Sequence, residues 1–350
     1  MNKRRKASPE KDLTASFLAG ELEDEPLDPQ ERFSQRSARA LQRRMRLTAL
    51  LRAAENAPVA GDIDTLPLGQ VTQVYSLYCE VEHEGRRWLC AVRKTLRALL
   101  DSPPVVGDLV RFRPLGEPDE RERPEGVIEQ VLSRTTVLTR ADSFKGTDPQ
   151  PIVANAQQML IVAAVVEPPL RLGLVDRMIV AARSGGLRPV VCLNKIDILP
   201  TTPAAQAQLA EGRQALDYYA KLGLDTLATS ATTGLGLERL REILRDRTTV
   251  LAGHSGVGKS SLIRALQPQL DIRIGHISHY TGKGTHTTTS ARRYDLTFGG
   301  HVIDTPGVKL FGLWNVTRDS LLEHFPDVAN GTAPLWRQAS YQRILESLPQ

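Results

Sequence analysis

Hydrophobic and polar positions follow two different patterns along the chain, and the change lies near residue 150. Beyond it, apolar runs alternate with amphipathic segments, which predicts a parallel sheet covered by helices. The runs 159–166, 189–193 and 248–252 are almost continuously apolar, as strands buried on both faces require. The second part of the chain is therefore predicted to be an α/β domain with a parallel sheet.

Helices and a hairpin complete this prediction. Residues 175–182 form the helix between the first two strands, and residues 261–266 begin the helix that follows the third. A hairpin is predicted over residues 294–303, about Phe298-Gly299-Gly300. The last 35 or so residues have a helical pattern, and we expect seven apolar side chains to attach them to the domain: Leu321, Leu322, Phe325, Leu335, Trp336, Ile344 and Leu345.

The preceding part of the chain has short alternating runs instead. Strands are predicted over 71–81, 88–93, 109–112 and 127–138, separated by turn signals such as Glu84-Gly85. Several short strands within about 75 residues predict a small closed barrel. An OB-type barrel fits this pattern, and an SH3-like barrel fits it nearly as well.

Residues 1 to about 60 are polar and charged, with one predicted helix from Ala38 to Arg52. Between Arg32 and Arg52 there are seven arginines and no acidic residue, for which a polyanion is the natural partner. A solvated helix or a disordered arm fits this composition equally well. The expected organisation has four parts. They are a basic, largely flexible extension (1–65), the barrel (66–145), the α/β domain (146–314) and a helical C-terminal segment (315–350).

Composition excludes several classes of protein. No apolar run approaches the roughly 20 residues that cross a bilayer, and charged residues follow the basic N-terminus where a signal peptide would be apolar. The three cysteines, Cys79, Cys90 and Cys192, never have Cys-x-x-Cys spacing, so neither a disulfide framework nor a cysteine-built zinc site is available. We expect a monomer of the cytoplasm that does not bind membranes.

A phosphate-binding loop follows the strand 248–252 and precedes a predicted helix, as its chemistry requires. Its glycines let successive N–H groups point at phosphates, Lys259 would reach the outer phosphates and also act in catalysis, and Ser260 would bind magnesium. A chance glycine-rich turn is the less favoured alternative. The loop residues are Gly253, His254, Ser255, Gly256, Val257, Gly258, Lys259, Ser260 and Ser261.

A second motif selects guanine as the base. Asn194-Lys195-Ile196-Asp197 follows an apolar strand, and the Asp197 carboxylate can accept hydrogen bonds from both the ring N–H and the amino group of guanine. The Lys195 stem can lie along the nucleotide, and Asn194 can brace the phosphate loop. Ser230-Ala231 is the companion motif, with the Ala231 N–H placed for the guanine oxygen.

Two further segments indicate a nucleotide-dependent switch. Asp304-Thr305-Pro306-Gly307 supplies an Asp linked to magnesium, most simply through water, and a Gly that senses the γ-phosphate. The threonine-rich loop 281–289 would add a magnesium ligand, for which we favour Thr288 over its neighbours. Val308 stands where Ras-type GTPases carry a water-orienting Gln, so we assign that role to His286.

The guanine motif precedes the phosphate loop, which is the reverse of the ordinary GTPase order. This permutation, the upstream barrel and the strings Gly-Thr-His-Thr-Thr-Thr and Asp-Thr-Pro-Gly-Val-Lys-Leu-Phe-Gly-Leu-Trp resemble the ribosome small subunit-dependent GTPase A (RsgA) family over about residues 68–314. The resemblance implies a circularly permuted GTPase that binds GTP, GDP and magnesium. It also implies a late assembly factor of the small ribosomal subunit that contacts rRNA and leaves after GTP hydrolysis.

The C-terminal segment departs from that family, which usually carries a zinc module of three cysteines and a histidine there. No cysteine follows Cys192, so zinc is not expected, and His276, His279 and His286 are the fallback ligands if zinc is found. An alternative function is an RNA-binding module that uses guanine nucleotide as a regulatory ligand with little turnover. Subunit-stimulated GTP hydrolysis distinguishes the two.

Overall fold

A computed structural model of the chain describes residues 49–50, 52–54, 62–75, 78–116, 123–140, 150–198, 202–270, 272, 291–305, 311–313 and 315–348. The chain divides into two units, Met1–Arg52 and Ala53–Gln350, and every strand named below lies in the second. Most of the predicted N-terminal helix falls outside the described residues. Those described there, 49–50 and 52–54, are helical.

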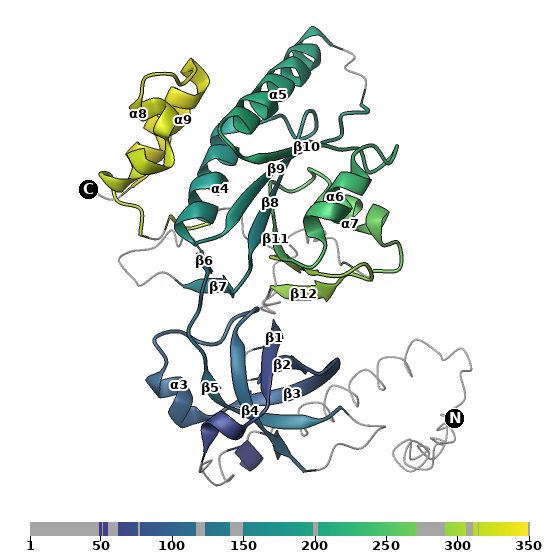
Figure 1. Cartoon of the computed structure of the whole chain (residues 1–350), viewed down its shortest axis with the longest axis vertical. Coiled ribbons are helices and arrows are strands. Elements are labelled where there is room, and N and C mark those ends of the chain that lie inside the picture. Colours follow the sequence, from purple (N-terminus) through teal and green to yellow (C-terminus); the bar gives the residue numbers. More distant parts are fainter. Residues whose placement is uncertain are drawn as a thin grey trace, which may run out of the picture. The chain divides into compact units, whose positions relative to one another are not determined.

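Five strands form a closed barrel (Figure 1). They are β1 (Leu68–Val74), β2 (Tyr78–His83), β3 (Arg86–Val92), β4 (Leu109–Leu115) and β5 (Glu125–Val131). Their order is β1-β2-β3-β5-β4, with β4 pairing back onto β1 and β3 parallel to β5. Helix α3 (Lys94–Leu99) lies between β3 and β4 in the chain. This Greek-key closure identifies the OB-like barrel and excludes the SH3-like alternative.

Two strand predictions in this region were wrong, because each covered two strands. The run 71–81 contains β1 and β2, which pair antiparallel with Val74 opposite Cys79. The run 127–138 contains β5 and the short β6 (Val137–Thr139), which leaves the barrel to pair with β7 (Pro151–Ala154). In the first case the apolar alternation continues from β1 into β2, so the sequence pattern does not mark the turn. In the second case the polar stretch Ser133–Thr136 separates two strands that belong to different sheets.

The second sheet has the predicted α/β form. Its order is β10-β9-β8-β11-β13-β12, with five parallel strands and an antiparallel edge strand β12 (Figure 1). The parallel strands are β8 (Gln158–Ala164), β9 (Arg188–Asn194), β10 (Asp225–Ala228), β11 (Thr248–Ala252) and β13 (His301–Asp304); β12 is Arg292–Asp295. The predicted hairpin is thus β12 and β13.

Helices cover both faces of this sheet. Helices α4 (Leu172–Ser184) and α5 (Pro203–Lys221) pack on the face that includes Met159 and Ile161 of β8. Helices α6 (Leu237–Leu244) and α7 (Lys259–Leu266) pack on the face that includes Leu160 and Val162. Alternate side chains of one strand therefore enter different cores, which explains why β8 is apolar throughout.

The C-terminal segment is helical, as predicted, and packs against α4 (Figure 1). It consists of a 3₁₀ turn η2 (Ser320–His324), α8 (Pro326–Ala329) and α9 (Leu335–Ser347). Leu321, Phe325 and Ile344 are buried against Val180 of α4. The expectation was wrong for two residues, since Leu335 is 83% exposed and Leu322 is 38% exposed.

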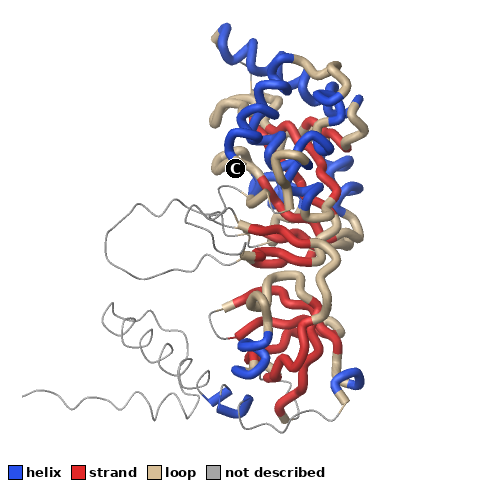
Figure 2. The backbone as a smooth tube through the Cα atoms, turned by 90° about the vertical axis from the view of Figure 1, so that its left-hand side faces the viewer, coloured by secondary structure: helices blue, strands red, loops and turns tan. Residues whose placement is uncertain are grey.

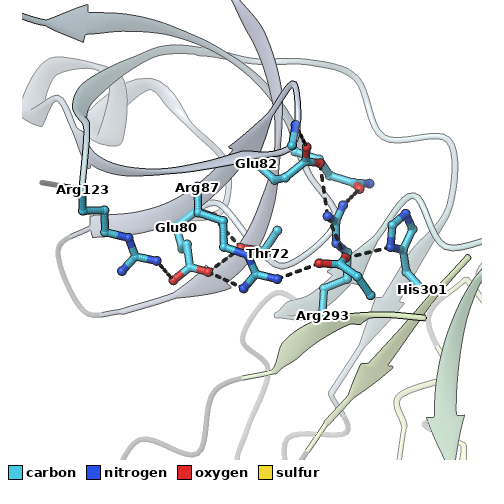
Figure 3. Close-up of polar contacts among 10 residues, drawn as sticks. Thr72, Glu80, Glu82, Arg87, Arg123, Arg293 and His301 are labelled. Carbon is cyan, nitrogen blue, oxygen red and sulfur yellow. Dashed lines mark hydrogen bonds and ion pairs between the residues drawn. The ribbon is translucent and has the colours of Figure 1, made fainter. Parts of the chain in front are cut away.

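The barrel and the second sheet are joined through the edge strand β12 (Figures 2 and 3). One residue pair links β12 to β1, and charged side chains add further links. Arg87 Nη2 of β3 lies 2.7 Å from Asp295 Oδ2, and Arg293 Nη2 lies 3.2 Å from Glu82 Oε2 of β2. The His301 hydrogen bond, with help from Arg293 and Arg87, holds the pKa of Asp295 below its usual range. Asp295 therefore remains an anion between the two sheets.

Candidate functional site

The predicted motifs meet at one edge of the parallel sheet. Asn194 ends β9, Gly253 follows β11, and Asp304 ends β13. These strands are parallel and follow the order β9-β8-β11-β13 in the sheet. Ala164 of β8 lies opposite Asn194, and Leu251 of β11 lies opposite Asp304. Ligands of open α/β sheets bind at this carboxyl edge. The permuted motif order thus produces one contiguous site.

Steric constraints explain why the phosphate loop has glycine at three positions. Gly253, Gly256 and Gly258 have φ values of 135°, 85° and 95°, which side chains rarely adopt. A Cβ at Gly253 would lie 2.2 Å from the Val162 oxygen, and one at Gly258 would lie 2.4 Å from Asn194 Nδ2. The loop can therefore curl closely against its neighbours. Helix α7 begins directly after it, so the first-turn N–H groups lack intrahelical acceptors and are available to an anion.

Lys259 and Asp304 are the two charged groups at this loop. Lys259 Nζ donates hydrogen bonds to the carbonyls of Gly253 and His254, at 2.9 and 3.1 Å. Burial lowers the pKa of Lys259, and the nearby Asp304 carboxylate opposes that shift. Burial likewise raises the pKa of Asp304, against the effect of Lys259. Burying either charge alone is costly. The Lys259 ammonium would therefore favour a bound phosphate, and the Asp304 carboxylate would favour a bound cation.

Asn194 connects the guanine motif to the phosphate loop. It is 1% exposed, and its Nδ2 donates to the Val257 oxygen at 2.9 Å, so the expected brace is present. Its Oδ1 accepts a hydrogen bond from Thr229 Oγ1 at 3.1 Å. Sequence reasoning gave Thr229 no role of its own, although its position beside Ser230-Ala231 was the available signal. Thr229 fixes the orientation of the Asn194 amide.

The remaining guanine-motif residues follow β9 and β10. Lys195 has a φ of 63°, and its Nζ donates to the Glu167 oxygen at 2.5 Å. Ser230 is buried, and its Oγ accepts from the Thr233 N–H at 3.0 Å, which shapes the turn that carries Ala231. Asp197 is half-buried and makes no hydrogen bond or ion pair with any other described residue. Its carboxylate is therefore available to a ligand.

Other predicted site residues cannot be placed. Thr288, His286 and Gly307 lie outside the described residues, as do His276 and His279. Among the described residues, no group of three or more histidine, cysteine, aspartate or glutamate side chains could hold a metal ion. No helix in the described part of the chain is both long and apolar enough to span a bilayer.

Comparison with known proteins gives a consistent result. The family described as "RsgA GTPase" matches residues 131–314, more than half of the chain. A small ribosomal subunit biogenesis GTPase RsgA from Photorhabdus laumondii is 38% identical over 260 residues, covering 73% of this chain and 70% of the relative. The protein of that name from Yersinia pseudotuberculosis is 39% identical over 264 residues, covering 73% and 71%.

Two solved structures have a similar fold. YjeQ from Thermotoga maritima superposes with a TM-score of 0.61 at 29% identity, covering 81% of this chain and 98% of that one. YloQ, a circularly permuted GTPase, has a TM-score of 0.58 at 22% identity, covering 83% and 99%. The fold is therefore that of circularly permuted GTPases, and the chain belongs to the RsgA GTPase family.

Proposed function

We propose that this protein hydrolyses GTP as a late assembly factor of the small ribosomal subunit, binds rRNA there, and leaves after hydrolysis. The names of its relatives support the ribosomal role. The observation that carries the enzymatic part is the hydrogen bond from Asn194 to Val257, which joins a guanine motif to a phosphate loop 63 positions later. We also propose that the protein acts in the cytoplasm as a monomer.

Base recognition would use the Asp197 carboxylate, which has no hydrogen bond or ion pair with another described residue. The carboxylate would accept the guanine ring N–H and amino group, and the Ala231 N–H would donate to the guanine oxygen. Lys195 would lie along the nucleotide while its Nζ remains on the Glu167 oxygen. Adenine lacks the donor pair that Asp197 requires, so we expect selectivity for guanine nucleotides.

Phosphate binding would use the loop 253–261 and the Lys259 ammonium. This ammonium is held by two loop carbonyls, which keeps it beside the loop. A triphosphate offers it stronger, charged acceptors. The pKa of Lys259 is lowered by burial, and the phosphate charge would reverse this effect. Lys259 would then stabilise charge that develops during phosphoryl transfer.

Magnesium fits the residues at the same edge. Ser260 lies in the first turn of α7, and Asp304 is a half-buried carboxylate that accepts a hydrogen bond from the Thr305 backbone N–H, so the donor set is the hard oxygen type that magnesium prefers. When bound, the ion would offset phosphate charge. Thr288 as a further ligand, Gly307 as the γ-phosphate sensor and His286 as the water-orienting group are part of the proposal.

The test is GTP turnover measured with and without purified small ribosomal subunits. We expect turnover to rise when subunits are added, and a GTP analogue that cannot be cleaved to keep the protein on pelleted subunits. Low turnover in both conditions, together with tight RNA binding, would instead support a nucleotide-regulated RNA-binding module.

A further inference from the structure

A cavity away from the nucleotide site lies between α4, α5 and α9, which are neighbours in Figure 1. Its volume is about 430 Å³, within the range of about 300–1,000 Å³ that is usual for ligand sites. The polar and aromatic side chains that line it are Arg171, Arg177, Glu211, Trp336, Ser340 and Arg343. None of the nucleotide motifs contributes to this cavity, so it calls for a different ligand.

The charges of the cavity favour an anion. Three guanidinium groups face one carboxylate, that of Glu211. Arg171 and Arg343 are exposed, and their side chains make no hydrogen bond or ion pair with other described residues. Arg177 donates only to Ser347 Oγ, at 2.8 Å, and burial lowers its pKa. Planar guanidinium donors without partners are well suited to phosphate.

The position of these arginines strengthens the argument. Two of them, Arg171 and Arg343, lie at the N-terminus of α4, where the helix dipole is positive and where cations are normally unfavourable. Arg171 is the N-cap residue, and the first turn carries no acidic side chain to compensate. A Cβ at Gly173 would lie 3.1 Å from Arg343 Nη1, so this guanidinium lies directly over the first turn. A bound anion would relieve the repulsion among all these positive groups.

An aromatic side chain in the lining indicates which kind of anion the cavity binds. Trp336 is half-buried in the lining, and its ring is held by edge contacts with Tyr218 and Tyr219, both at 5.7 Å between centroids. A fixed indole beside phosphate-binding arginines is how single-stranded RNA is commonly recognised, through a stacked base and a backbone contact. A free phosphate ion or an acidic peptide would leave the indole unused.

We propose that this cavity binds one nucleotide of single-stranded RNA, with the arginines on its phosphate and Trp336 on its base. The proposal rests on the proposed action on the ribosomal subunit, but its test needs no GTP hydrolysis. A failed RNA test would therefore leave the GTPase assignment intact, and a failed turnover test would leave the cavity intact.

The experiment compares full-length proteins for binding to a fluorescein-labelled single-stranded oligouridylate, followed by anisotropy across about 50–200 mM salt. The variant is Arg171→Gln with Arg343→Gln. Losing the contact to this one phosphate should reduce the slope of log K against log salt by about 0.7 and weaken binding about tenfold. The matched control is Arg213→Gln with Arg245→Gln, exposed arginines that lie outside the cavity and also lack partners among the described residues.

The control should differ little from the wild type. Equal losses in both double variants would mean diffuse surface attraction and would overturn the proposal, as would an unchanged slope in the cavity variant. Polyglutamate or inorganic phosphate that competes as well as unlabelled RNA would also overturn it. In a Trp88→Phe, Trp314→Phe background, which leaves Trp336 as the one tryptophan, fluorescence should be quenched by oligouridylate and much less so once the two cavity arginines are replaced; equal quenching would contradict the assigned geometry.

Discussion

The attachment of the C-terminal segment depends on a buried ionic cluster, which makes Arg337→Met the most informative stability variant. Arg337 is 1% exposed; its Nε lies 3.0 Å from Asp327 Oδ2, and its Nη1 donates to Asp176 Oδ1. Asp176 and Asp327 are themselves almost fully buried. The guanidinium carbon also lies 4.3 Å from the Phe325 ring centroid, a cation–π contact.

Methionine keeps most of the volume but leaves two buried carboxylates without a cation. Breaking a buried pair from one side costs about 3–5 kcal/mol, and we expect a loss of that size for the unfolding of the C-terminal segment. The measurement is denaturant unfolding followed by Trp336 fluorescence, because this ring contacts Tyr218 and Tyr219 beside the cluster. The control is Gln342→Met on the exposed side of α9, which should change stability by no more than about 0.5 kcal/mol.

The pH dependence of the loss is a sharper test. Burial raises the pKa of Asp176, while Arg337 opposes that shift. A carboxyl whose folded pKa is raised binds more protons in the folded state, so its contribution to stability falls as pH rises towards the folded pKa. Removing Arg337 raises the folded-state pKa of Asp176 further, so the pH range over which stability falls becomes wider. The deficit of Arg337→Met should therefore be larger at about pH 8 than at about pH 5.

A rescue variant tests the cause directly. Adding Asp176→Asn and Asp327→Asn to Arg337→Met removes the uncompensated charges and should recover much of the lost stability. A deficit below about 1 kcal/mol, or one that is equal at both pH values and not rescued, would refute the view that charge burial holds the segment in place.

Three further outcomes are expected. Asp197→Asn should weaken GTP binding and favour xanthosine triphosphate in a competition titration, and an unchanged preference would remove Asp197 from the base site. Lys259→Ala should lower turnover by roughly 10²–10³, because we propose that the ammonium stabilises charge that develops during phosphoryl transfer; wild-type turnover would mean that the phosphate loop was misidentified. Deleting residues 1–60 should weaken subunit binding and flatten its salt dependence while intrinsic turnover survives; equal salt slopes would make the extension a passive tail.

Strands buried on both faces were predictable because their composition is uniform. The run 248–252 coincides with β11, and the phosphate loop after it could be recognised from spacing alone. Barrel strands were harder, since β1 and β2 alternate in the same way on both sides of their turn. Helix α5 was not predicted at all. Only three of its nineteen residues, Gly212, Ala215 and Tyr219, are buried, so its apolar stripe is weak.

The cluster at Arg337 could not be predicted for a different reason. Its partner Asp176 is 161 positions away in the chain, and both residues stand in stretches that read as ordinary helix surface. An isolated arginine in an amphipathic segment is usually solvated, so sequence reasoning assigned the attachment to apolar contacts. Only the packing of α9 on α4 reveals that the two charges are buried together.

Helix α4 connects the nucleotide site to the C-terminal segment. The loop that leads into α4 contains Glu167, whose carbonyl accepts a hydrogen bond from the Lys195 ammonium. Its buried face carries Asp176, which holds Arg337 of α9, and its first turn lies beneath Arg343. A change in Lys195 when guanine binds would therefore act on the start of the helix that also fixes the C-terminal segment. Charged contacts to α4 and the apolar core around Val180 give that segment a defined position.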